Sequence, residues 1–196
     1  MYKKQMILQR ITSYLLLAAS VLVFIYSIGI MTDIYRSFNL ASSWKESHRY
    51  YFEGAKIYEY MQDFNRELVV ASIILILSSV SLFVFRSHDR RKYYIANYIT
   101  IGVNALTNIG ISVWALIQVF SYKSMFVNGI DFAKYEIAAG KYKFQYTPPT
   151  QTFWFDISAV VFAVLLIVTA ISLFNLFYKI YLMKAERKLL EEGMEA

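Results

Sequence analysis

Hydrophobic positions along the chain fall into four long runs, and this pattern predicts four helices. The runs cover residues 11–31, 68–85, 95–120 and 155–177, and Asp156 is the only Lys, Arg, Asp or Glu within them. Each run reaches or approaches the ~20 residues that an α-helix needs to cross a ~30 Å hydrocarbon core. We therefore expect an all-α integral membrane protein with a four-transmembrane-helix bundle.

The predicted bundle forms a single membrane domain over residues 1–196, without an internal repeat. A soluble helical protein is a poor alternative, because so small a chain lacks the interior volume to bury four such runs. Lys3 and Lys4 precede the first run as in a secretory signal, but that run is longer than a typical signal core, so we expect a retained helix. The helices are expected at about 11–32, 55–86 (with an outer extension), 94–121 and 154–188.

Composition supports the membrane interpretation. The chain is 58% hydrophobic and only 17% charged, with a mean hydropathy of +0.41. Its formal charge of +6 does not indicate a nucleic-acid partner, because the basic residues lie beside the predicted helix ends. Membrane lipids are the expected surroundings instead.

Four cations between the second and third runs indicate the orientation in the membrane. By the positive-inside rule this short connection is cytoplasmic, together with both termini, while residues 33–66 and 121–153 are extracytoplasmic. The same cations are suited to binding anionic lipid headgroups. They are Arg86, Arg90, Arg91 and Lys92.

The exported segments have no cysteine to staple them, which favours the cytoplasmic membrane of a bacterium as the location. Ser43 and Glu46 have capping-box spacing, so a short helix ending near Gly54 is expected. Residues 141–146 alternate polar and aromatic side chains as a strand does. The aromatic side chains of both segments are candidates for an extracytoplasmic contact surface: Trp44, Tyr51, Tyr58, Tyr142, Phe144 and Tyr146.

The third helix has a polar stripe within the predicted bilayer. Amides in hydrocarbon need partners, so this face should look towards other helices or another subunit. Packing or subunit contact is favoured over a polar permeation path, because no ionisable residue joins the stripe. Serines repeat every seven residues on the first two helices and suggest matching seams, as do Thr169, Ser172 and Asn175 on the fourth. The stripe is Asn97, Thr100, Asn104, Thr107, Asn108 and Gln118.

Catalytic and metal-binding patterns are poorly represented. His88 and Asp89 are adjacent, but the only other histidine, His48, is expected on the opposite side of the membrane. A four-ligand metal site therefore cannot be assembled. We expect no cofactor, no metal and no enzymatic activity.

Two stretches resemble a group of small four-pass membrane proteins of Gram-positive bacteria that accompany carbohydrate ABC importers. They are FNREL at residues 64–68, and SHDRRKYYIANYI at residues 87–99 followed directly by the third helix. The resemblance implies a partner, either the importer's membrane subunits (permeases) or its exported sugar-binding protein. It transfers no functional residue.

The expected function is thus a non-catalytic membrane subunit that docks on a transporter complex through its extracytoplasmic cap and one helix face. The alternative is a homo-oligomeric channel or carrier, in which several copies turn Asn104 and Asn108 towards a shared polar path. A ligand sensor that uses the aromatic cap is a third class, and it is disfavoured because no signalling domain follows on the cytoplasmic side.

Overall fold

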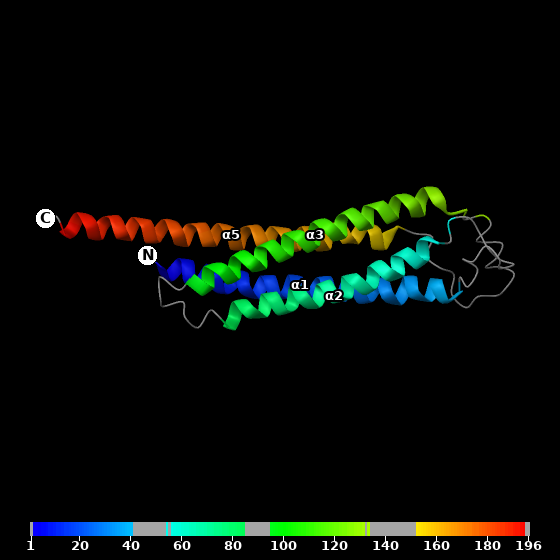
Figure 1. Ribbon diagram of the computed structural model, residues 1–196, viewed down its shortest axis with the longest axis horizontal. Coiled ribbons are helices and arrows are strands. Elements are labelled where there is room, and N and C mark those ends of the chain that lie inside the picture. The colour runs from blue at the N-terminus through cyan, green and yellow to red at the C-terminus, as the bar shows by residue number, and fades with distance from the viewer. Residues whose placement is uncertain are drawn as a thin grey trace. The chain divides into compact units, whose positions relative to one another are not determined.

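The computed structural model describes residues 2–40, 54, 56–84, 95–131, 133 and 152–194. These residues form four long helices (Figure 1), and no strand occurs among them. The predicted all-α class is confirmed for this part of the chain. The helices are α1 (Tyr2–Leu40), α2 (Ile57–Val84), α3 (Ile95–Gly129) and α5 (Phe153–Met194).

All four helices are long and apolar enough to cross a membrane. Even the shortest, α2, has 28 residues, which at ~1.5 Å per residue exceeds the ~30 Å hydrocarbon core. The prediction of four helices able to span a membrane is thus confirmed in length and composition, which suggests a multi-pass membrane protein. The candidate spans are Lys3–Ile30, Tyr60–Val84, Asn97–Gly129 and Phe153–Leu190.

The helices extend beyond the apolar runs that predicted them. Helix α1 begins at Tyr2 and ends at Leu40, beyond both ends of the expected 11–32, and α3 continues to Gly129 instead of 121. The apolar pattern marks only the part suited to lipid, whereas Gln, Lys, Arg and Ser also permit helix. Part of the segments expected as 33–66 and 121–153 is therefore helical. The predicted short helix before Gly54 and the strand at 141–146 lie outside the described residues.

The chain divides into two compact units, and each contains a stretch of every helix. They are described separately below. Unit 1 comprises Met1–Val21, Ile74–Ser112 and Ala163–Ala196, and unit 2 comprises Leu22–Ile73 and Val113–Phe162.

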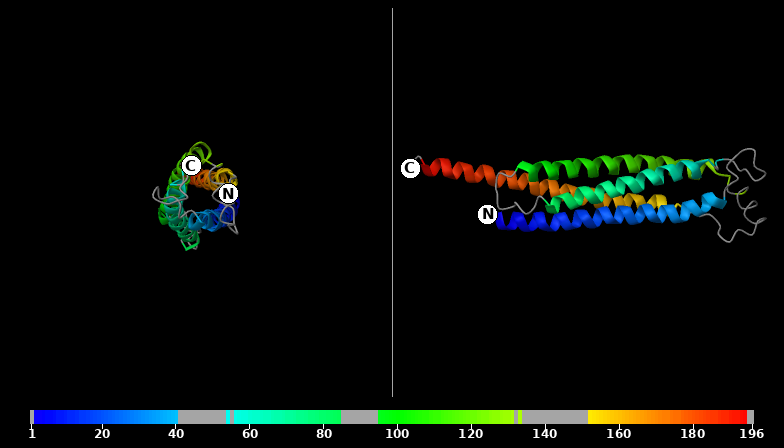
Figure 2. Two further views of the ribbon diagram at one scale, coloured as in Figure 1. Left: turned by 90° about the vertical axis from the view of Figure 1, so that its right-hand side faces the viewer. Right: turned by 60° about the horizontal axis from the view of Figure 1, so that its bottom comes forward.

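In unit 1, the helix pairs α1–α2 and α3–α5 run antiparallel. The first part of α1 lies beside the end of α2, where Tyr14 packs on Phe83 with ring centroids 5.0 Å apart. The end of α5 lies beside the start of α3, where the Tyr98 hydroxyl donates to the sulfur of Met183 at 2.6 Å. Figures 1 and 2 show both pairs of helices side by side.

Unit 2 is held together by aromatic side chains. Phe64 of α2 contacts Trp114 and Tyr122 of α3, with ring centroids 5.3 and 5.6 Å apart. Tyr26 of α1 packs against Trp154 of α5 and donates a hydrogen bond to its carbonyl oxygen at 2.9 Å. Tilted ring pairs of this kind stabilise a core beyond the area they bury.

The predicted outer extension of the second helix has an identifiable packing role in this unit. Ile57, Met61, Phe64 and Leu68 recur every three or four residues and are all buried, whereas Tyr60 is half exposed. This is the pattern of an amphipathic helix with one face against a core. The apolar face of this extension is therefore covered by unit 2 itself.

Two local devices fix helix ends in unit 2. The carbonyl of Thr152 accepts hydrogen bonds from the amides of Phe155 and Asp156 at the start of α5. The negative charge of Asp156 is favourable at this helix N-terminus. Its carboxylate also accepts a hydrogen bond from the ammonium group of Lys123 on α3 at 2.5 Å. Gly54 has φ of +84° and touches the end of α3, because a Cβ there would lie 2.0 Å from the carbonyl oxygen of Gly129. Glycine suits this position because it adopts positive φ without strain and has no Cβ to collide with Gly129.

Gly29 permits the close approach of α1 and Trp154, and this predicts a sensitive position. A Cβ at Gly29 would lie 2.5 Å from the Trp154 ring, which is wedged against Tyr26 and Phe153. We expect Gly29→Ala to lower the free energy of unfolding by about 1–3 kcal/mol through overpacking. Tryptophan fluorescence during denaturation in detergent micelles measures the change.

Gly110→Ala is the matched control, because a Cβ at that helical glycine meets nothing within 4 Å. Alanine has the higher helix propensity, so this variant should keep or raise stability by up to ~1 kcal/mol. Equal destabilisation by the two variants would contradict the packing assigned to Gly29.

Candidate functional site

The interiors of the two units differ in chemistry. Among the described residues of unit 2, the buried side chains are 14 hydrophobic and four polar ones. In unit 1, they are nine hydrophobic and 14 polar or charged ones. Polar residues inside a membrane bundle are costly and mark functional positions by default. We name the polar interior of unit 1 the polar core: Gln5, Gln9, Thr12, Ser13, Ser20, Ser79, Asn97, Asn104, Asn108, Ser112, Thr169, Ser172, Asn175 and Lys179.

One branch of the polar core joins α1 to α3 through amides. The side-chain amide of Gln5 donates to Gln9 at 3.1 Å, and the amide of Gln9 donates to the oxygen of Asn97 at 3.1 Å. Gln5 and Gln9 are four residues apart and so share one helix face. All three side chains are buried, and the branch therefore ties the start of α1 to the start of α3.

A second branch joins α2, α3 and α5. Asn104 donates to the hydroxyl of Ser78 at 3.0 Å. Asn108 donates to the oxygen of Asn104 at 3.1 Å and to the hydroxyl of Thr169 at 3.0 Å. The polar stripe thus connects three helices of unit 1 within a single copy of the chain.

Serine hydroxyls join α1 to α2 in unit 1. Ser20 of α1 and Ser79 of α2 are both fully buried, and their hydroxyls are 2.9 Å apart. Ser13 and Ser20 also donate to the carbonyl four residues earlier on their own helix. Small side chains that satisfy themselves in this way let two helix backbones come close together.

Lys179 is a member of the polar core that the sequence analysis missed. Its side chain is only 3% exposed, and its ammonium group lies 4.9 Å from the centre of the Tyr98 ring. A cation over an aromatic face is stabilised electrostatically. The sequence analysis counted no ionisable residue among the polar positions. However, Lys179 follows Asn175 by one helical turn and falls on the same face.

The predicted stripe residues differ in their burial. Asn97, Asn104 and Asn108 are buried, whereas Thr100, Thr107 and Gln118 are partly exposed, and Gln118 belongs to unit 2. The basic cluster Arg86, Arg90, Arg91 and Lys92 lies outside the described residues. So do Trp44, Tyr51, Tyr142, Phe144 and Tyr146, and of Tyr58 only the helical backbone is described.

Other members of the polar core had weaker signals in the sequence. Gln5 and Gln9 precede residue 11, where the first helix was expected to begin, although their four-residue spacing indicates a shared face. Ser112 lies one turn after Asn108 and extends the stripe. Polar residues at helical spacing thus indicate these positions in the sequence itself.

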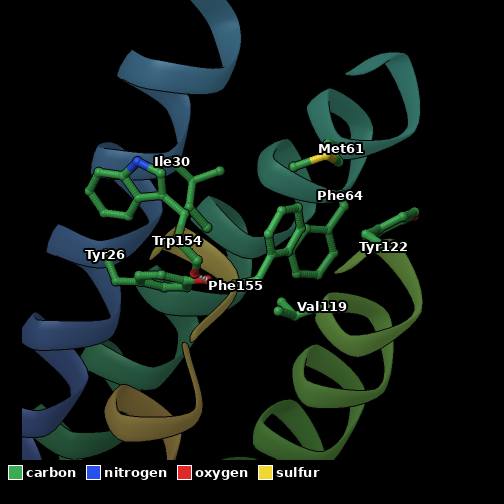
Figure 3. Close-up of a pocket in the computed structure, with 8 residues that line it drawn as sticks. All are labelled: Tyr26, Ile30, Met61, Phe64, Val119, Tyr122, Trp154 and Phe155. Carbon is green, nitrogen blue, oxygen red and sulfur yellow. Dashed lines mark hydrogen bonds between the residues drawn. The ribbon is translucent and has the colours of Figure 1, made fainter. Parts of the chain in front are cut away.

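Unit 2 contains a small aromatic cavity (Figure 3). Its volume of about 10 Å³ is at the lower limit for a single ordered water. The lining is almost entirely apolar, so the cavity is better explained as imperfect ring packing than as a ligand site. Its lining residues come from all four helices: Tyr26, Ile30, Met61, Phe64, Val119, Tyr122, Trp154 and Phe155.

Among the described residues, no three His, Cys, Asp or Glu side chains lie close enough together to hold a metal ion. The polar core supplies amides, hydroxyls and one ammonium group, which bind polar groups by hydrogen bonds. Comparisons with protein-family models, curated proteins and solved structures find no match to the chain. Functional inference therefore rests on the buried polar groups and exposed faces of the chain itself.

The hydrogen bond between Asn108 and Thr169 predicts measurable coupling between α3 and α5. In a double-mutant cycle with Asn108→Ala and Thr169→Val, we expect a coupling free energy between about 0.6 and 2 kcal/mol, as for other hydrogen bonds between membrane helices. Unfolding with a denaturing detergent, followed by fluorescence, measures each variant.

A cycle that combines Asn108→Ala with Ser13→Ala is the control. Ser13 donates to the carbonyl of Gln9 on its own helix and shares no described hydrogen bond with Asn108. Its coupling should be close to zero. A coupling as large as that of the Asn108 and Thr169 pair would show that the cycle reports general loosening and not this bond.

Proposed function

We propose that the chain is a non-catalytic membrane subunit that docks on a transporter complex, with a carbohydrate ABC importer as the expected class. The resemblance of residues 64–68 and 87–99 to small proteins that accompany such importers supports this choice. The polar groups of unit 1 bond largely to one another, so the docking surface must lie elsewhere. The exposed helix faces supply the candidates.

The observation that carries the proposal is an exposed aromatic stripe on α5. Phe174, Phe177 and Tyr181 are spaced by three and four residues, lie on one face and are 65–67% exposed. Aromatic side chains are enriched where proteins contact one another, because they bury a large area at small cost in conformational entropy. We name Phe174, Phe177 and Tyr181 the aromatic stripe and assign the docking contact to it.

The exposed face of α3 in the same unit provides the contrast. It presents the aliphatic side chains of Ile99, Val103 and Leu106, which are 59%, 54% and 73% exposed. Branched aliphatic side chains match lipid tails and gain little from a protein partner in their place. We therefore assign this face to lipid and the aromatic stripe to the partner.

Site-directed photo-cross-linking tests the assignment. With p-benzoylphenylalanine in place of Phe177, irradiation of native membranes should join the chain to one specific protein, identified by mass spectrometry, in near-stoichiometric yield. The same amino acid in place of Leu106 is the matched control in unit 1, and there the products should be lipid adducts. We expect transporter components among the proteins captured at Phe177.

Each alternative gives a distinct result. Lipid adducts alone at Phe177 would overturn the docking assignment. Cross-links between two copies of this chain would replace the transporter partner with self-association. Capture of the same protein from Leu106 would show that the contact is not confined to the aromatic stripe.

The charge distribution supports cytoplasmic termini as part of this proposal. The described side chains of unit 1 include seven lysines or arginines and one acid, whereas those of unit 2 include three and four. Positively charged segments beside transmembrane helices resist export. We therefore place the N-terminal end of α1 and the C-terminal end of α5 in the cytoplasm.

Single-cysteine labelling tests this orientation without background, because the chain has no cysteine of its own. Lys3→Cys should react with a membrane-impermeant maleimide only in inverted vesicles. Lys56→Cys, exposed just before α2, should react in intact cells. The reverse pattern would invert the proposed topology.

A homo-oligomeric channel lined by the third helix is less well supported. Its proposed lining residues, Asn104 and Asn108, are 2% and 0% exposed, and they bond to α2 and α5 within one copy of the chain. A shared pore between copies would require these bonds to break. The proposal therefore remains a docking subunit.

A further inference from the structure

Two fully buried polar atoms lie one helical turn apart on α3. The side-chain oxygen of Asn108 and the hydroxyl of Ser112 are both inaccessible and have no hydrogen-bond partner among the described residues. Both side chains are 0% exposed. An unsatisfied polar atom in such a place costs free energy, so its surroundings need an explanation.

The orientation of the Asn108 amide is fixed by its neighbours. The hydroxyl of Thr169 gives its only hydrogen to the carbonyl of Leu165 at 2.8 Å, so towards Asn108 it can only accept. The amide nitrogen of Asn108 must therefore face Thr169, and it also bonds to the oxygen of Asn104. Reversing the amide would break both bonds, which leaves the oxygen as the atom that needs a donor.

Ser112 differs from five other buried serines of the described chain. Ser13, Ser20, Ser27, Ser72 and Ser158 each donate to a carbonyl three or four residues earlier on their own helix. This back-bonding is the usual way to satisfy a hydroxyl inside a membrane helix. The hydroxyl of Ser112 makes no such bond, so it is available to a ligand.

We propose that Asn108 and Ser112 bind an ordered water molecule inside unit 1. Side chains four residues apart on a helix are ~5–6 Å apart at Cβ, a span that one water can bridge. The water donates to the Asn108 oxygen and accepts from the Ser112 hydroxyl, which satisfies both atoms. A larger ligand is disfavoured because both side chains are completely enclosed.

The water extends the second branch of the polar core. Hydrogen bonds then run from Ser78 through Asn104 and Asn108 to Ser112, with a side connection to Thr169 on α5. Chains of this kind polarise and strengthen one another in a low-dielectric interior. The buried nitrogen of Asn97 and the buried oxygen of Asn175 in the same unit also have no hydrogen-bond partner among the described residues.

Water-edited solid-state NMR on the isotope-labelled chain in lipid bilayers tests the proposal. It measures how fast magnetisation from water protons reaches individual carbons. The Cβ signal of Ser112 should build up several-fold faster than those of Ser20 and Ser72, which are equally buried at 0% exposure but bonded to carbonyls. These two serines are matched controls for residue type and burial.

Two variants assign the effect to the bridge. Ser112→Ala should slow the build-up at the Asn108 side-chain carbonyl to the level of a dry site, whereas Ser20→Ala should leave it unchanged. Equal build-up at Ser112, Ser20 and Ser72 would overturn the proposal and indicate that the Ser112 hydroxyl turns to its own backbone. Because the experiment uses the chain alone, its outcome is independent of the docking function.

Discussion

The interior of unit 1 is governed by the cost of leaving an amide without a hydrogen-bond partner where bulk water does not reach. This requirement explains why asparagine and glutamine side chains meet across helices instead of facing outwards. Gln9 reaches Asn97, and Asn108 reaches Thr169, each at about 3 Å. Hydrogen bonds have direction, so they specify which helices are neighbours and in what register. Apolar contacts alone would allow the helices of this unit to slide or rotate at little cost.

Unit 2 meets a different constraint with different side chains. Its core is built from Tyr26, Phe64, Phe155, Phe162 and other large apolar groups, so shape rather than hydrogen bonding selects the arrangement. Glycine is needed at the closest contacts, as Gly29 beneath Trp154 shows. Specificity in one unit thus depends on satisfied polar atoms, and in the other on steric fit. The two units should accordingly tolerate different kinds of substitution.

The fold was largely predictable from sequence, because lipid imposes a simple rule of length and polarity on a spanning helix. That rule located all four helices but not their ends, since helix formation in α1 and α3 continues where hydrophobicity stops. The amides of α3 were also recognisable, because Asn97, Asn104 and Asn108 stand out in an apolar run. The burial of Lys179 and Gln9 was not predicted, because a polar residue near a helix end is expected to face water. Only its neighbours on other helices show that it is buried. The pairing of amides with hydroxyls depends on how each helix is rotated about its axis. That rotation could not be derived from a single sequence.

The unusual length of α5 has a consequence for the surrounding bilayer. Its 42 residues correspond to roughly 63 Å of helix, about twice the thickness of the hydrocarbon slab. A short transmembrane helix is sensitive to mismatch with bilayer thickness. A helix longer than the bilayer can tilt or shift along its axis without burying either end in the hydrocarbon core. The chain is therefore suited to membranes of different thickness, and it leaves several helical turns at the height of the headgroups and beyond.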